Sequence, residues 1–137
     1  MKKIYLPCII GAFLLSCNSD DDSDLDPIVG TWKITSSKVD GKEIHSTNDC
    51  DKDNSMTFFY DGKIKDNYSY INLQNECVNS EKFFEWENSG NSVYKIDDFE
   101  VKIIFSNDNN TFTETLTIKG LNNEDVTVAI TRLKINL

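Results

Sequence analysis

The sequence predicts an all-β protein: an eight-stranded antiparallel up-and-down barrel that follows a cleaved signal peptide and a disordered acidic tether. Composition is the first reason, because the chain has eight Phe, five Tyr and two Trp but only two Ala. Together with abundant Thr, Asn, Asp and Ser, this favours strands and polar turns over helices. The second reason is that short segments alternate apolar and polar residues, whereas no segment repeats its apolar residues about every 3.6 positions.

Turn residues separate the predicted strands. Asp40-Gly41 and Asp61-Gly62 lie between alternating segments, where Asp-Gly is a strong signal for a β-hairpin. Sequential hairpins form a meander, and an eight-stranded meander can close into a barrel whose interior is either filled or large enough for a ligand. The predicted strands span residues 30–39, 54–60, 63–71, 82–88, 92–97, 100–106, 111–119 and 125–135.

The start of the chain has the features of an export signal. Lys2 and Lys3 precede an apolar run over residues 4–15, which is too short to span the roughly 30 Å bilayer core as a helix. The run ends in LLSC, which resembles the lipobox of bacterial lipoproteins. The resemblance implies a signal peptide over residues 1–16 and acyl chains, including palmitate, on Cys17 that anchor the mature lipoprotein. The alternative is an incidental Cys at the end of an ordinary signal.

Residues 17–27 form the lipidated Cys and an acidic linker. Residues 18–26 contain five Asp and one apolar residue, so this segment cannot bury enough apolar surface to order itself. An acidic run behind a lipidated Cys resembles the surface-export signal of lipoproteins in the Bacteroidetes. The resemblance implies the bacterial outer membrane, and it leaves both the periplasmic and the cell-surface face open.

Charge excludes one class of partner. The chain has 14 basic and 23 acidic residues, a net charge of −9. Loss of Lys2 and Lys3 with the signal leaves 12 basic residues against 23 acidic ones, or −11. A nucleic-acid partner requires the opposite sign, so we expect none. The part that remains, over residues 28–137, is long enough for one domain with one core.

Two positions of this domain carry a family resemblance. Gly30-Thr31-Trp32 matches the Gly-x-Trp signature on the first strand of lipocalins, and Arg132, the only Arg, lies on the last predicted strand. In lipocalins an Arg on the last strand packs across that Trp and closes the base of the barrel. The resemblance therefore implies that Gly30, Trp32 and Arg132 close the barrel, with the guanidinium within about 6 Å of the indole ring. Further positions resemble short lipocalin-like lipoproteins of the Bacteroidetes: Cys50, Met56-Thr57-Phe58, Asp61-Gly62 and Trp86.

The other cysteines predict a disulfide. One Cys leaves with the signal and Cys17 is assigned to lipid, so Cys50 and Cys77 remain as an even pair in an oxidising compartment. Two free thiols are the alternative. No metal or cofactor is predicted, because these two Cys and His45 would supply only three zinc ligands. The acidic segment 49–54 lacks the Gly and the Glu that an EF-hand requires.

Two carboxylates stand on otherwise apolar strand faces. Glu114 shares its face with the apolar residues of 111–118, and Asp66 lies between Ile64 and Tyr68. Either they are solvated at an open mouth or turned outward by a bulge, or they anchor a small ligand inside the barrel. The candidate ligand-lining residues are Tyr60, Tyr68, Tyr70, Phe84, Trp86 and Glu114. The aromatic residues among them also suit an ordinary core.

These observations favour a lipid-anchored protein of the cell envelope that binds a small apolar or amphipathic ligand without catalysis. The alternative is a structural or interaction module, whose barrel is fully packed and whose acidic surface binds an envelope protein. An enzyme has no support, because no nucleophile–base pair or metal cluster is visible in the sequence. The size of the interior separates the first two hypotheses, since a ligand needs a cavity of about 300 Å³ or more.

Overall fold

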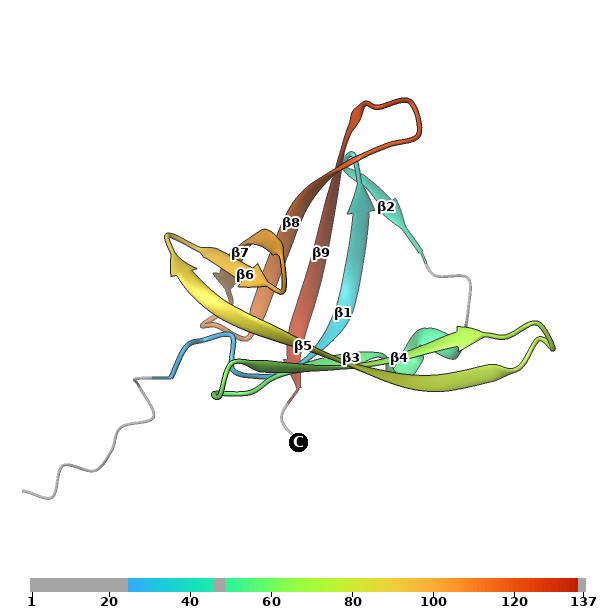
Figure 1. Ribbon diagram of the computed structural model, residues 1–137, viewed down its shortest axis with the longest axis horizontal. Coiled ribbons are helices and arrows are strands. Elements are labelled where there is room, and N and C mark those ends of the chain that lie inside the picture. The colour runs from blue at the N-terminus through green and yellow to red at the C-terminus, as the bar shows by residue number, and fades with distance from the viewer. Residues whose placement is uncertain (1–24, 46–48, 136–137) are drawn as a thin grey trace, which may run out of the picture.

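The computed structural model describes residues 25–45 and 49–135 (Figure 1). The predicted signal peptide and Cys17 lie outside the described residues. The described residues form strands and a single 3₁₀ helix, η2 (Asp49–Asp53). The strands are β1 (Gly30–Val39), β2 (Lys42–Ile44), β3 (Ser55–Phe58), β4 (Lys63–Ile71), β5 (Cys77–Gly90), β6 (Val93–Ile96), β7 (Phe99–Ser106), β8 (Thr111–Lys119) and β9 (Asp125–Ile135).

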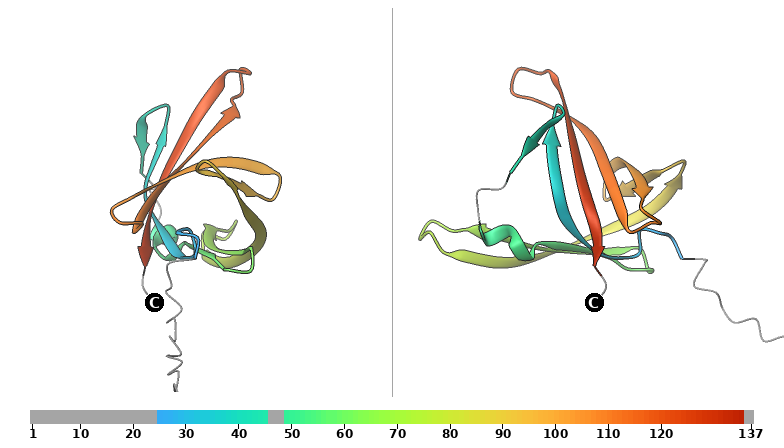
Figure 2. Two further views of the ribbon diagram at one scale, coloured as in Figure 1. Left: turned by 90° about the vertical axis from the view of Figure 1, so that its left-hand side faces the viewer. Right: turned by 180° about the vertical axis from the view of Figure 1, so that it is seen from behind.

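The strands form one antiparallel sheet that closes on itself. Its order is β2-β1-β3-β4-β5-β6-β7-β8-β9, and an additional ladder joins β1 to β9 from Thr31↔Ile135 to Val39↔Val128. Because β2 pairs only with the far end of β1, the other eight strands make the ring, and each pairs with its neighbours in sequence (Figure 2). The predicted eight-stranded up-and-down barrel is confirmed, as is the adjacency of its first and last strands.

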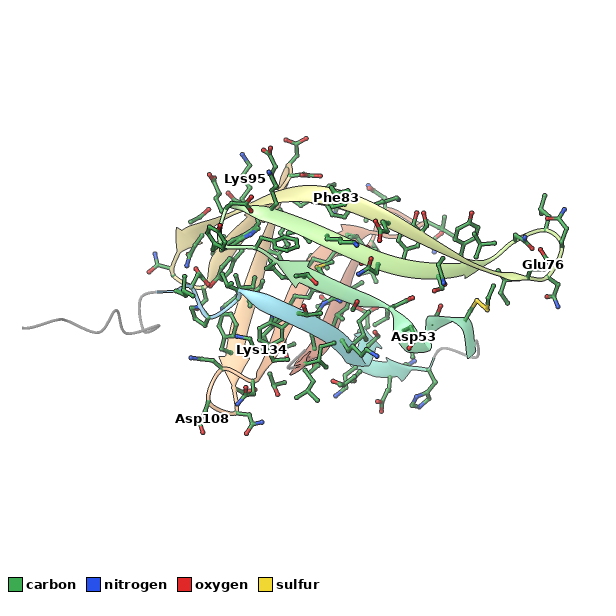
Figure 3. The ribbon with its side chains drawn as sticks, turned by 90° about the horizontal axis from the view of Figure 1, so that it is seen from below. Asp53, Glu76, Phe83, Lys95, Asp108 and Lys134 are labelled. Atoms are coloured by element: carbon green, nitrogen blue, oxygen red, sulfur yellow. A yellow bond between two sulfur atoms is a disulfide. The ribbon has the colours of Figure 1, made fainter. Side chains whose placement is uncertain are left out.

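The two ends of the barrel differ. At one end, here called the closed end, β1 begins and the β3–β4 and β7–β8 turns lie. At the other, the open end, the β8–β9 hairpin and the β4–β5 hairpin point in different directions (Figure 1). The divergence follows from strand lengths: β3 and β6 have four residues each, so neither covers the far halves of β4 and β5. Those halves leave the barrel as a two-stranded ribbon, with Glu76 at its tip (Figure 3).

Three local predictions were wrong. The strand predicted at 82–88 is β5, which starts at Cys77 because its first residues pair with β4 up to Ile71↔Cys77, although they are too polar to alternate clearly. The strand predicted at 54–60 ends at Phe58, because Gly62 N–H donates to Phe59 O and forms a turn. Neither β2 nor η2 was predicted, since segments of three and five residues are too short to show a periodic pattern.

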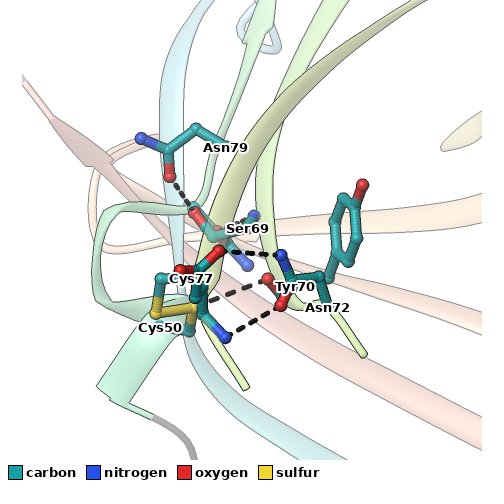
Figure 4. Close-up of a disulfide and its surroundings, with 8 residues drawn as sticks. Cys50, Ser69, Tyr70, Asn72, Cys77 and Asn79 are labelled. Atoms are coloured by element: carbon teal, nitrogen blue, oxygen red, sulfur yellow. Dashed lines mark hydrogen bonds between the residues drawn. A yellow bond between two sulfur atoms is a disulfide. The ribbon is translucent and has the colours of Figure 1, made fainter. Parts of the chain in front are cut away.

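The predicted disulfide between Cys50 and Cys77 is present, with the Cα atoms 5.6 Å apart (Figure 4). It links η2 to the start of β5, across a sequence separation of 27 residues. Cys50 Sγ also lies 3.8 Å from Tyr70 O, on the strand paired with β5. The disulfide therefore attaches the segment before β3 to the projecting β4–β5 ribbon, which lacks other strands beside it.

The closed end is filled by an aromatic core. Trp32 and Phe112 pack edge to face with ring centroids 4.5 Å apart, and Phe58 packs against Phe112 in the same manner at 6.3 Å. The Trp32 indole N–H donates to Ile28 O at 2.7 Å, so the segment before β1 seals the base of the barrel. The side chains that are under 2% exposed are Trp32, Phe58, Phe112, Ile28, Ile64 and Ile103.

The linker ends on the barrel rather than beside it. Asp26, which the sequence assigned to the acidic linker, accepts hydrogen bonds from Tyr94 OH at 2.8 Å and from Asn88 Nδ2 at 2.6 Å. Its Oδ1 also accepts from the Ile28 N–H. Burial, followed by the hydrogen bond and the charge of Asp26, raises the pKa of Tyr94. Asp26 is therefore part of the folded domain, and it lies at the closed end.

Candidate functional site

A buried ion pair lies directly above the aromatic core. Alternation along β8 and β9 points Glu114 and Arg132 into the barrel, where they are 6% and 7% exposed. Arg132 Nε and Nη2 both donate to Glu114 Oε1, at 3.1 and 2.8 Å. The ladder pairs Arg132 with Phe112 and Glu114 with Ile130, so the backbone of Arg132 is level with Phe112, whereas Glu114 lies two residues further toward the open end.

This geometry decides between the interpretations of Glu114. The expectation that it is solvated at the mouth or turned outward by a bulge was wrong, because the carboxylate is buried and paired. The resemblance implied that Arg132 packs on Trp32, so the pair with Glu114 was not predicted. The signal was present, since Glu114 and Arg132 each occupy the apolar face of a predicted strand, and a buried charge requires a partner.

The cation on the ring of Trp32 is Lys134 rather than Arg132. Lys134 is the cross-strand partner of Trp32, and its Nζ lies 5.2 Å from the indole centroid. Gly30 makes room for it: at φ 139° it has no Cβ, and a Cβ there would lie 2.5 Å from Lys134 Cε. Arg132 pairs with Ile34, two residues further along β1, and its guanidinium is held by Glu114. The predicted contact between Arg132 and Trp32 was therefore wrong.

A second pair of charges faces the first from the β4–β5 wall. Asp66 and Lys82 are cross-strand partners on the inner face, next to the Ile64↔Phe84 pair of the core. Burial raises the pKa of Asp66, and the charges of Arg132 and then Lys82 act in the opposite direction. We call these four residues, Arg132, Glu114, Asp66 and Lys82, the charged layer. It separates the filled closed end from the open end.

The aromatic residues that were predicted to line a ligand site divide into three groups. Phe84 and Trp86 pack against the core, and the Trp86 indole N–H donates to Phe59 O. Tyr60 is 82% exposed on the β3–β4 turn, so its assignment to the interior was wrong. Tyr68 and Tyr70 remain at the open end, where their rings stack at 6.2 Å and 29°.

The strand faces above the charged layer are apolar and partly exposed. Leu116 and Ile118 continue the inner face of Glu114 along β8, and they pair with Val128 and Val126 on β9. Ile118 is 46% exposed, and Ile34, on the inner face of β1, is 45% exposed. A hollow of about 460 Å³ lies on the β4–β5 ribbon and another of about 340 Å³ lies beside the β3–β4 turn, and neither is lined by a residue of the charged layer. The first is lined by Asp53, Asn67, Tyr68, Ser69, Asn79, Ser80 and Glu81.

Residues 25–45 and 49–135 contain no group of three or more His, Cys, Asp or Glu side chains placed to hold a metal ion. Within the same ranges, no helix is long and apolar enough to cross a membrane. Every buried side-chain nitrogen and oxygen described has a hydrogen-bond partner. The open end and its charged layer are thus the candidate site.

Comparisons with known proteins agree with this architecture. Residues 28–128 match the model of a family described as a lipocalin-like domain. Among solved structures, bovine odorant binding protein complexed with its natural ligand is 12% identical, with a TM-score of 0.50, over 86% of this chain and 77% of that chain. The bovine lipocalin allergen Bos d 2 is 15% identical, with a TM-score of 0.48, over 81% and 76%. No curated protein matches the chain.

Proposed function

The chain belongs to the lipocalin-like domain family, and from this premise we propose that it binds a small apolar or amphipathic ligand at the open end of its barrel. Lipocalins generally bind small hydrophobic molecules and are typically carriers without catalytic activity. The bovine odorant binding protein, described in complex with its natural ligand, is an example of this fold with a bound ligand. We accordingly propose a binding role without catalysis for this chain.

The observation that carries the proposal is the apolar inner face above the charged layer. Side chains there point into the barrel but stay partly exposed, as Ile34 and Ile118 do at 45% and 46%. Burying such surface against a ligand is favourable by about 25 cal/mol per Å². The filled core leaves no comparable apolar surface at the closed end. The ligand therefore lies above the charged layer, with its apolar part against β8 and β9.

A substitution that blocks the inner face of β8 tests this placement of the ligand. Leu116→Arg puts a long cation on the inner face of β8, whereas Thr117→Arg puts the same group on the outer face one residue further. The neutral fluorescent probe N-phenyl-1-naphthylamine should bind the wild type and Thr117→Arg with equal affinity, and Leu116→Arg at least 10-fold more weakly. Equal binding by both variants would contradict the location, and no binding by the wild type would contradict the function.

We also propose that the mature protein is anchored through acyl chains on Cys17 to the bacterial outer membrane, at its periplasmic or cell-surface face. The LLSC sequence after an apolar run supports this, and two or more acyl chains suffice for stable binding. Cys17→Ala should remove metabolic palmitate label and release the protein from the membrane fraction. Unchanged membrane partition of this variant would contradict the anchor.

A structural or interaction module is the second candidate. Leu73 and Leu121, at the tips of the β4–β5 and β8–β9 hairpins, are completely exposed, and apolar residues at such tips suit a protein partner. The probe titration separates the two candidates, because a pure interaction module would bind no small apolar probe. A partner on the cell envelope would then be sought by crosslinking from positions 73 and 121 in intact cells.

A further inference from the structure

The charges of the charged layer are unequally satisfied. Arg132 directs two N–H groups at Glu114 Oε1, so these two groups neutralise each other within the barrel. In the described part of the chain, the carboxylate of Asp66 has neither a hydrogen-bond donor nor an ion-pair partner. Lys82, across the ladder from Asp66, is exposed. The group of the layer that lacks a direct partner among the described residues is therefore the Asp66 carboxylate.

The surroundings of Asp66 favour a positive group. Burial raises the pKa of this carboxyl even though Arg132 and Lys82 lower it, so the desolvation of the carboxylate exceeds the compensation by these two cations. A donor that reached the carboxylate from the open end would form a charge-assisted hydrogen bond in a partly desolvated place. The net charge of the chain, −9, attracts cations to the barrel as a whole.

The aromatic wall beside Asp66 already holds an ammonium group. Tyr68 is the next inner-face residue of β4, and Lys82 Nζ lies 5.2 Å from the centroid of its ring. Tyr70 stacks on Tyr68 and extends this wall toward the tip of the ribbon. Cations bind aromatic faces at such distances. Because Lys82 is exposed, its flexible side chain has room to move into solvent when another cation replaces it.

We propose that the ligand is an organic ammonium compound whose cationic group pairs with Asp66 and lies on the ring of Tyr68, in place of the Lys82 ammonium. Its apolar part lies along the inner faces of β8 and β9. This inference rests on the proposed binding function and specifies the class of ligand. A carboxylate ligand fits less well, since Asp66 repels it and the guanidinium of Arg132 is already bound to Glu114.

Matched probes of one chain length test the charge preference. Octylammonium, octanol and octanoate are titrated against bound N-phenyl-1-naphthylamine, using the chain from residue 18 onward. This chain carries the whole barrel, because β1–β9 pairing closes the ring within residues 25–135. Octylammonium should displace the probe at a concentration at least 10-fold lower than octanol, and octanoate should be the weakest of the three.

Variants at Asp66 and its neighbours identify the group responsible. Asp66→Asn should remove the advantage of octylammonium over octanol, measured as the ratio of the concentrations at which the two displace the probe. Glu100→Gln is the matched control, because Glu100 is an exposed carboxylate on β7 that lies next to the buried Val101 and therefore on the outer face. It should change nothing. Lys82→Ala should bind octylammonium as tightly as the wild type or more tightly.

The outcomes separate this inference from the proposed function. If octanol and octylammonium displace the probe equally, or if Asp66→Asn keeps the preference, the ammonium assignment is overturned and the binding function stands. If octanoate is the strongest competitor and Lys82→Ala weakens it, the site is an anion site. If the fluorescent probe itself does not bind the folded wild type, both the function and the inference are overturned.

Discussion

Removal of the Glu114 charge should cost the barrel a large part of its stability. Glu114 and Arg132 side chains are each 8% exposed, and among the described residues the carboxylate oxygen of Glu114 is the only hydrogen-bond acceptor of the guanidinium. Glu114→Gln keeps the size of the side chain but removes its charge. Arg132 is then a buried cation whose nearest remaining carboxylate, Asp66, acts only at a distance.

The magnitude follows from the burial of the pair. Breaking a buried ion pair by removing one partner typically costs about 3–5 kcal/mol, and the field of Asp66 offsets part of it, so we expect about 3 kcal/mol. Domains are stable by about 5–15 kcal/mol, so this loss is easily measured. Replacing both partners with apolar residues of similar size, Glu114→Leu with Arg132→Met, should restore stability to near the wild-type value, because neither member of the pair is left as an unpaired buried charge.

Urea unfolding followed by tryptophan fluorescence, with the disulfide intact, measures both effects. A double-mutant cycle then gives the coupling energy of the pair. The control is the ion pair of Lys119 and Asp125, whose side chains are 61% and 65% exposed. Its coupling should stay below about 1 kcal/mol. If the coupling energy of Glu114 and Arg132 is no larger than that of the control pair, burial does not strengthen this ion pair and the reasoning is refuted.

Three further results are expected. Reduction of the Cys50–Cys77 disulfide, or Cys50→Ser with Cys77→Ser, should lower unfolding free energy by about 2–4 kcal/mol in urea. The pKa of Asp66 is raised above 3.8, so the folded chain holds this proton more tightly than the unfolded chain and loses stability as pH rises through that range. Asp66→Asn should therefore be more stable than the wild type at pH 7. The difference in unfolding free energy between the two should become smaller below about pH 4 in the same urea assay. Tyr94→Phe removes the hydrogen bond to Asp26 and should cost about 1.5–3 kcal/mol, with faster amide exchange at the start of β1.

The ring of strands could be predicted because each strand carries its own evidence. Period-two alternation marks one face for the core, and Asp-Gly turns join consecutive strands, so a meander follows without knowledge of distant contacts. At Asp40-Gly41 both residues adopt positive φ, of 49° and 76°, as the sequence requires for such a hairpin. The ribbon beyond the barrel could not be predicted, since residues 77–81 become a strand only by pairing with β4.

Strand patterns could not predict which of Arg132 and Lys134 lies on the ring of Trp32. The two residues are separated by two positions and share a face, so alternation alone allows either to reach Trp32. The register between β1 and β9 decides, because it pairs Lys134 with Trp32 and Arg132 with Ile34. Resemblance to lipocalins favoured Arg132 and was wrong at this residue while correct for the fold. The Glu114–Arg132 pair, by contrast, could have been found from the two predicted faces.

The position of Arg132 connects the stability of the fold to its candidate site. Because Lys134 covers Trp32, Arg132 lies one layer higher, where it neutralises Glu114 and forms the floor of the open end. A substitution of either partner therefore alters the core and the site together. Asp66 is on the same floor but is bound to neither partner, so its replacement changes the charge that a ligand meets without breaking the pair. If the ligand differs among related barrels, the residue at the position of Asp66 is where that difference can arise at the least cost in stability.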